Sequence, residues 1–283
     1  MIFKNKHDEV RIIWRVVLLV GPFLLIAFLL RYIPIRIRTQ ILINQGMTQP
    51  AALSRSSNYF MEDPIGSSIL GILQGLSWYL LVFLLIRFIE KRKTSLKDFG
   101  LDPKKNRIQL LPLGLVFGAL MYFGYIAFDS LLGESNFNFD LADLGLVSIL
   151  LMVLNFVANG FGEETAFRSY LQTHLIKRHG LWMGIGVTSI IFVLLHLLIS
   201  PFTMQALFGS IFLAGILGIL FALTRSVYLV GTMHAAFNLM PSLLGQWPSD
   251  LSLVIVNGFL FLMTIVIYSL FEKGKKDKTL TRR

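Results

Sequence analysis

The stretch GLWMGIGVTSIIFVLLHLLISPFTMQALFGSIFLAGILGILFALT, residues 180–224, contains no Asp, Glu, Lys or Arg. A helix needs about 20 apolar residues to cross the hydrocarbon core of a bilayer, so this stretch is too long for one span. Proline disfavours continuation of a helix, and Ser200-Pro201 offers a natural break. The stretch therefore predicts two consecutive membrane spans, residues 181–199 and 204–224.

The composition of the whole chain agrees with a polytopic membrane protein. Of its 283 residues, 55% are hydrophobic and 15% are charged, and the mean hydropathy is +0.69. Soluble domains carry about 25% charged residues. The 24 Phe, 9 Pro and 0 Cys exclude collagen-like, disordered and disulfide-stapled proteins. The absence of Cys also excludes zinc-thiolate sites, iron–sulfur clusters and a cysteine nucleophile.

We predict an all-α protein with about eight transmembrane helices. The expected spans are residues 12–30, 65–86, 108–128, 144–162, 181–199, 204–224, 227–244 and 251–271. They divide the chain into three N-terminal helices with their loops (1–143), a central core (144–244), and a last helix with a basic tail (245–283). Glycine pairs such as Gly71/Gly75 and Gly114/Gly118 permit close helix contact, but they also arise by chance in a Gly-rich membrane chain.

The positive charge predicts the topology. The formal net charge is +10, and its Lys and Arg cluster before the first span and after the second, fourth, sixth and eighth. Cytoplasmic loops retain such residues, so both termini are expected in the cytoplasm, with the plasma membrane as the expected location. Arg36, Arg38 and Arg55 disagree, since they fall on the supposed outer side. The basic tail is expected to meet anionic membrane lipids, and no folded basic patch indicates nucleic-acid binding.

Ionisable groups at membrane depth are costly and mark candidate functional sites. Glu163 and Glu164 follow the fourth span in FGEETAFRSYL, and Arg168 stands at i+4 from Glu164. One interpretation ends the helix at Gly162, so that both acids face water. The apolar spacing after Thr165 instead favours one helix over residues 144–176, roughly 50 Å long at 1.5 Å per residue. In that helix one acid faces a cavity while Glu164 pairs with Arg168.

Two later spans contain the other polar candidates. His196 lies in IIFVLLHLLI, one turn after Phe192, and His234 and Asn238 share a helical face in GTMHAAFNLM. A lone membrane histidine is more often a packing residue than a catalytic one. His and Asn also commonly supply hydrogen bonds between helices.

Taken together, these three motifs resemble the CPBP (CAAX protease and bacteriocin-processing, Abi) family of intramembrane endopeptidases, which includes the Ras-converting CAAX prenyl protease. The order is Glu-Glu-x-x-x-Arg, Phe-x-x-x-His and His-x-x-x-Asn on successive core helices, within about residues 144–244. The resemblance implies eight helices around a polar intramembrane cavity open to the cytoplasm, and it assigns the catalytic core to residues 144–244.

The resemblance also implies a glutamic endopeptidase and a role for each motif residue. Glu163 takes a proton from a water molecule that His196 positions, and His234 and Asn238 stabilise the oxyanion. Glu164 and Arg168 support the base, and Phe192 lines the pocket. No cofactor is expected. Zinc is an alternative, because two His and two Glu could bind it, although adjacent glutamates differ from a HExxH helix.

The expected substrate is a membrane-bound peptide or a lipidated protein, such as one with a prenylated CAAX-type C-terminus. An alternative is bacteriocin self-immunity or a membrane scaffold without catalysis; the complete motif set argues against it. A proton-coupled transporter would use the same acids and imidazoles as a relay. The N-terminal spans contain no matching ionisable residues, which disfavours this third hypothesis.

Overall fold

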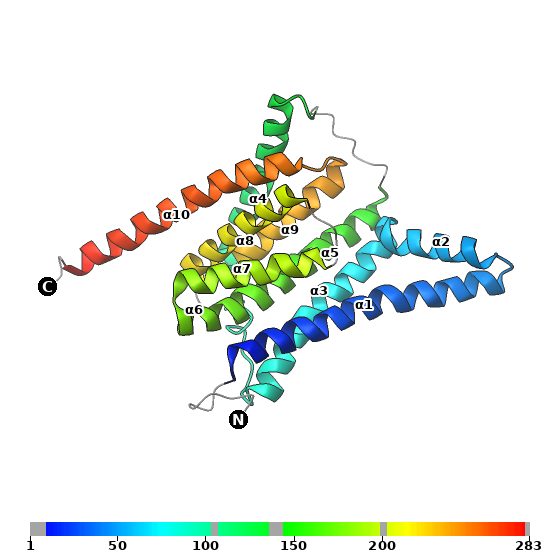
Figure 1. The fold of residues 1–283 in the computed structure, drawn as a ribbon, viewed down its shortest axis with the longest axis horizontal. Helices are drawn as coiled ribbons and strands as arrows, with labels where there is room; N and C mark the ends of the chain where they lie inside the picture. The colour runs from blue at the N-terminus through cyan, green and yellow to red at the C-terminus, as the bar shows by residue number, and fades with distance from the viewer. Residues whose placement is uncertain (1–9, 103–106, 136–143, 199–202, 281–283) are drawn as a thin grey trace.

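The computed structural model describes residues 10–102, 107–135, 144–198 and 203–280, which form helices with no strand among them. Most of the helices lie alongside one another (Figure 1). In order, the helices are α1 (Ile12–Asn44), α2 (Gln49–Met61), α3 (Pro64–Leu84), α4 (Leu111–Leu131), α5 (Leu146–Glu164), α6 (Thr173–His179), α7 (Leu181–Leu197), α8 (Met204–Thr224), α9 (Val227–Leu244) and α10 (Asp250–Leu280).

The all-helical, polytopic class is confirmed. Among the described residues, seven helices are long and apolar enough to cross a membrane. The expected eighth span is α7, a shorter apolar helix of 17 residues, at the lower end of the length that spans a bilayer. The predicted break at Ser200-Pro201 lies outside the described residues.

The first predicted span is longer than expected. α1 continues beyond residue 30 to Asn44, with Pro22 and Pro34 inside it, and α2 then returns along it. Figure 1 shows this hairpin at the edge of the bundle. Arg36, Arg38 and Arg55, which disagree with the charge rule, all lie on α1 and α2. The Arg38 guanidinium lies 3.8 Å from the ring centroid of Tyr59, so one of these charges rests against an aromatic ring within the hairpin.

The middle of the bundle is built around α5, which packs against α3 on one side and α9 on the other. The backbones of α3 and α5 approach closely. A Cβ placed on Gly75 would lie 2.4 Å from the carbonyl carbon of Ala158, and one on Gly162 would lie 2.4 Å from the Gly75 oxygen. Glycine therefore permits the contact that holds the end of α5 against α3.

The long helix predicted from the fourth span is confirmed, with an interruption. Residues Leu146–His179 form one helical rod, in which a π-helical stretch, Thr165–Gln172, joins α5 to α6. We call this stretch the π segment. All eight of its residues are buried, and π-helical turns of this kind occur frequently at functional sites. The start of α1 and the end of α10 lie on the same side of the bundle as α6 (Figure 1).

Candidate active site

Three helices bring polar side chains together inside the bundle. Glu163 and Glu164 are the last residues of α5, His196 lies near the end of α7, and His234 lies in α9. The Oε2 atom of Glu163 is 3.9 Å from Nε2 of His196 and 3.8 Å from Nε2 of His234. The two acids are 8% and 0% exposed. The interpretation in which both acids face water is therefore wrong.

Glu164 is held on both oxygens. Its Oε2 accepts a hydrogen bond from Nε of Arg168 at 3.1 Å, and its Oε1 lies 3.0 Å from Nδ1 of His234. Glu164 and Arg168 are both 0% exposed, so the expected i,i+4 ion pair forms entirely within protein. His234 lies between the two carboxylates, with Nδ1 facing Glu164 and Nε2 facing Glu163.

The tautomer of His196 follows from its neighbour one turn earlier. Nδ1 of His196 lies 2.8 Å from the main-chain oxygen of Phe192. A carbonyl oxygen can only accept, so Nδ1 carries the proton and donates it. In a neutral ring, Nε2 is then an acceptor, and it is this nitrogen that faces Glu163. The His196 side chain is 36% exposed, so this side of the site opens outward.

The ring of Phe192 contacts the groups around it. Its centroid is 4.4 Å from that of His196 and 6.0 Å from that of His234. The Arg168 guanidinium carbon lies 5.4 Å from the same centroid, within the range of a cation–π contact. Phe167 of the π segment meets the Phe192 ring edge-on at 5.1 Å. Phe192 thus separates the buried arginine from the two imidazoles and fixes their spacing.

Asn238 lies one turn after His234 on α9 and is half-buried. Its position on the same helical face agrees with the i,i+4 spacing of the motif. The other six motif residues form one connected cluster through the contacts above. Asn238 extends that cluster along α9.

The sequence reasoning missed two polar residues that precede Glu163 on the same face of α5. Asn159 donates to the main-chain oxygen of Gly71 on α3 at 2.9 Å and to Oδ1 of Asn155 at 2.7 Å. Asn155, Asn159 and Glu163 follow one another at i,i+4 spacing, which places them in one row. That spacing is visible in the sequence and was the available signal. The row fastens α5 to α3 one turn before the acids.

A second carboxylate cluster was also missed. Glu90, at the end of the helical stretch that continues α3, pairs with Arg15 of α1 and with Nε of Arg92 at 2.7 Å. The Tyr170 hydroxyl of the π segment donates to Glu90 at 2.8 Å. Nε2 of His174 is 3.7 Å away. Apart from Arg92, the partners come from distant parts of the chain, so spacing gave no signal for them. The cluster ties α1 to the π segment.

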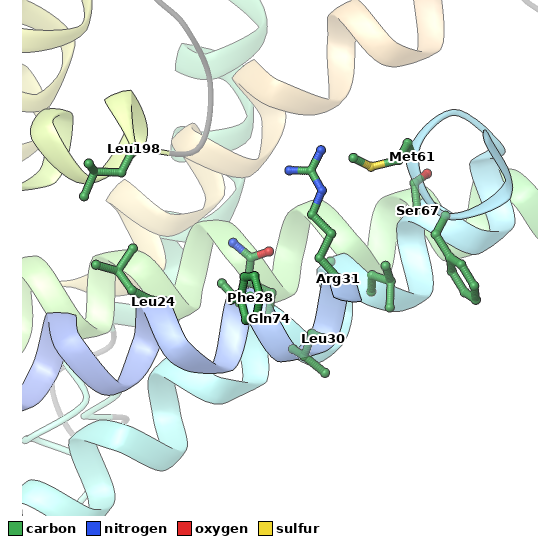
Figure 2. A pocket seen from close by; sticks show the side chains of 12 residues that line it. Leu24, Phe28, Leu30, Arg31, Met61, Ser67, Gln74 and Leu198 are labelled. Atoms are coloured by element: carbon green, nitrogen blue, oxygen red, sulfur yellow. The ribbon is translucent and has the colours of Figure 1, made fainter. Parts of the chain in front are cut away.

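A pocket of about 460 Å³, which we call the lateral pocket, is lined by none of the seven motif residues. Its walls come from α1, α2, α3 and the residue after α7. Figure 2 shows Arg31 extending from α1 into the space that Leu198 and Met61 border. Leu198 is two residues after His196, and Gly71, another wall residue, accepts the Asn159 hydrogen bond. The pocket therefore reaches the end of α7 and a residue of α3 that contacts α5 one turn before Glu163.

Among the described residues, no three His, Asp or Glu side chains form a group placed to hold a metal ion. One nitrogen of His234 faces Glu164, and one nitrogen of His196 faces the Phe192 carbonyl.

Comparison with known protein families agrees with the motif pattern. Residues 145–240 match the model of a family described as type II CAAX prenyl endopeptidase Rce1-like. The matched stretch contains all seven motif residues. No curated protein matches the chain.

Proposed function

We propose that this multi-pass membrane protein is a CAAX-type endopeptidase, like the Rce1-like family whose model residues 145–240 match, and that it cleaves by glutamic catalysis with Glu163 as the base. The observation that carries the proposal is the convergence of Glu163, His196 and His234 from three helices. Their facing atoms lie 3.8 and 3.9 Å apart, longer than a direct hydrogen bond. Across such distances a water molecule commonly bridges polar groups.

The acceptor atoms suit a nucleophilic water. Oε2 of Glu163 accepts one proton of the water, and the unprotonated Nε2 of His196 accepts the other. The lone pairs of the water oxygen then remain free to attack a peptide carbonyl. As attack proceeds, Glu163 takes the proton and later delivers it to the leaving amine. The new bond joins the water oxygen to the carbonyl carbon, and the carbon–nitrogen bond breaks.

In this proposal His234 and Asn238, one turn apart on α9, stabilise the oxyanion. With Nδ1 donating to Glu164, Nε2 of His234 can donate only when both ring nitrogens carry protons. The Glu164 carboxylate balances that positive charge, and Arg168 holds the carboxylate in place. Donors aimed at the developing charge are worth about 10²–10³ each in rate. Glu164 and Arg168 are therefore positioning residues, and Phe192 spaces the imidazoles.

The proposed substrate is a membrane-associated peptide or a lipidated C-terminal segment such as one of the CAAX type. The lateral pocket supports this proposal, because its apolar wall residues suit a chain that resides in the bilayer. We further propose that residues 144–244 form the catalytic core and that both termini face the cytoplasm at the plasma membrane. The clusters of Lys and Arg between alternate spans support this orientation.

The proposal is tested with purified protein in phosphatidylcholine vesicles and a synthetic peptide ending in a farnesylated CAAX sequence. We expect release of the terminal tripeptide, detected by mass spectrometry, and loss of this product with Asn238→Ala or His196→Ala. The same peptide without the farnesyl group tests the lipid requirement. Cleavage that the two variants leave unchanged would contradict the assigned roles.

A chelator experiment separates the glutamic mechanism from the zinc alternative. Cleavage that survives a strong chelator is the expected result. Loss of cleavage in chelator, with recovery when zinc is added, would overturn the glutamic mechanism.

A further inference from the structure

A second pocket lies at the end of the bundle where α6 and α8 end, away from the acid–imidazole cluster. Its volume is about 260 Å³. The walls come from four places: the loop after α3, the turn before α4, the π segment with α6, and the end of α8 with the turn to α9. The charged residues that line it are five cations and one acid: Arg92, Lys97, Arg107, Lys177, Arg225 and Asp98.

The positive charge of this pocket exceeds what its acid neutralises. Oδ1 of Asp98 pairs with Arg92 at 2.7 Å, and Oδ2 accepts from the Ser95 main-chain nitrogen at 2.8 Å. Arg92 also pairs with Glu90 behind the pocket. Both acids near the pocket therefore already have partners, Arg92 among them. Lys97, Lys177 and Arg225 are exposed and leave a surplus of positive charge around the opening.

The pocket lies at the level where lipid headgroups meet protein. α8 ends at Thr224 and α9 begins at Val227, and both helices are long and apolar enough to cross the membrane. The turn that joins two consecutive spans lies at the membrane surface, so Arg225 stands at headgroup depth. Basic pockets between transmembrane helices at this depth suit the phosphate groups of anionic lipids.

We propose that this pocket binds the phosphate of an anionic phospholipid headgroup. Lys supplies compact positive charge, and Arg presents several N–H donors in a fork that fits phosphate oxygens. The volume admits a headgroup phosphate while the acyl chains stay in the bilayer. Free phosphate has the same chemistry, but the position between two spans favours the lipid.

A headgroup bound in this pocket also affects the π segment. Ser169 donates to the main-chain oxygen of Asp98 at 2.9 Å, and Thr173 donates to the main-chain oxygen of Arg168 at 3.3 Å. Both side chains line the pocket. A bound headgroup therefore stabilises the stretch that presents Arg168 to Glu164. We expect the bound lipid to raise the thermal stability of the protein.

The test measures the thermal unfolding of the purified chain in a zwitterionic detergent with three probes. These are dioctanoyl-phosphatidylglycerol, dioctanoyl-phosphatidylcholine and inorganic phosphate. The variant is Lys177→Gln/Arg225→Asn. Arg225 has φ 53°, a left-handed conformation that Asn tolerates, and Arg107 bonds to its main-chain oxygen, which the substitution retains. Lys273→Gln, an exposed lysine outside the pocket, is the matched control.

We expect phosphatidylglycerol to stabilise the wild type and the control, and phosphatidylcholine to do so far less. Each cation removed near an anionic headgroup weakens affinity about fivefold, so the double variant should bind about 30-fold more weakly. If its unliganded melting temperature is lowered, the two single variants are compared instead, each with about a fivefold loss expected.

Equal stabilisation by both lipids, or undiminished phosphatidylglycerol binding in the variants, would overturn the proposal. Inorganic phosphate that stabilises the wild type but not the pocket variants, while phosphatidylglycerol stabilises neither, would overturn the proposal that the ligand is a lipid. Stabilisation by phosphatidylglycerol alone, or stronger stabilisation by phosphatidylglycerol than by inorganic phosphate, would support the lipid as the ligand.

Discussion

The clusters around Glu164 and Glu90 use similar side chains and differ in what lies next to them. Each carboxylate is nearly buried and meets an arginine and a histidine. Glu90 also receives a second arginine and a tyrosine hydroxyl. Beside Glu164 stands Glu163, whose two imidazole neighbours remain 3.8 and 3.9 Å away.

The number of close donors indicates whether a buried carboxylate has a structural role or stays available as a base. The oxygens of Glu90 are occupied by strong donors, so they have no capacity to take a proton from a substrate or a water molecule. In the Glu164 cluster, Glu164 itself takes the strong donors and orients His234. Its neighbour Glu163 faces two imidazole nitrogens. Nε2 of His196 is an acceptor, and Nε2 of His234 also donates to the oxyanion in the proposed mechanism. The functional acid is therefore expected to be the less tightly bonded one.

The largest expected effect is on the chemical step. Glu163→Gln keeps the size of the side chain and removes its capacity as a base, so cleavage per folded molecule should fall by about 10²–10⁴. Unfolding of the variant should resemble that of the wild type. Initial rates in vesicles and thermal unfolding check both parts. A variant that retains most of its cleavage rate would remove Glu163 from the role of base.

The next largest expected effect is on the free energy of unfolding, through the ion pair of the Glu164 cluster. Arg168→Met removes one partner of a fully buried ion pair and should cost about 3–5 kcal/mol of unfolding free energy. Glu164→Gln/Arg168→Met removes the uncompensated charge and should recover much of that loss. Unfolding in mixed micelles with increasing dodecyl sulfate provides the measurement. A double variant as unstable as Arg168→Met would show that the pair is not the source of the loss.

A smaller effect is expected in the Glu90 cluster. Glu90→Gln weakens hydrogen bonds to charged groups, which are worth about 1.5–3 kcal/mol each. The cleavage rate per folded molecule should stay within about twofold of the wild type. The same mixed-micelle unfolding and vesicle assay check both quantities. A large loss of rate without a loss of stability would make the Glu90 cluster part of the catalytic machinery.

The smallest effect is at the edge of the Glu90 cluster. Arg92 pairs with Glu90 and Asp98, but its side chain is 41% exposed. Ion pairs with exposed partners contribute about 0–1 kcal/mol, so Arg92→Gln should change the unfolding free energy by less than about 1 kcal/mol. A substantially larger loss would mean that the cluster depends on Arg92 rather than on Arg15.

The contacts in the Glu164 cluster could be predicted well from the sequence and those in the Glu90 cluster poorly, for a physical reason. Glu164 and Arg168 are one turn apart on one helix, so helical spacing alone predicts their pairing. The contacts of Glu90 with Arg15 and Tyr170 depend on how α1 packs against the π segment, which no local pattern encodes. The row of Asn155, Asn159 and Glu163 has helical spacing and could have been recognised.

The fold was likewise predictable where a local pattern determines it and not where packing does. Apolar length and composition predicted most spans, because a bilayer fixes the length of a helix that crosses it. The continuation of α1 to Asn44 and the α2 hairpin were missed, since an apolar run predicts the span that crosses the bilayer and not the helix beyond it. The π segment was also missed. Its residues have an ordinary helical pattern, so their spacing does not distinguish a π-helical stretch from an α-helix.

The most direct test of the central claim, that Glu163 is the catalytic base of a membrane protease, compares membrane peptides from cells. The cells express wild-type protein, Glu163→Ala or, as a control, Glu90→Gln at equal abundance. We predict a fragment that disappears only with Glu163→Ala while its precursor accumulates. Indistinguishable peptide profiles, with any cellular phenotype intact in Glu163→Ala, would contradict the claim and favour a role in immunity or scaffolding.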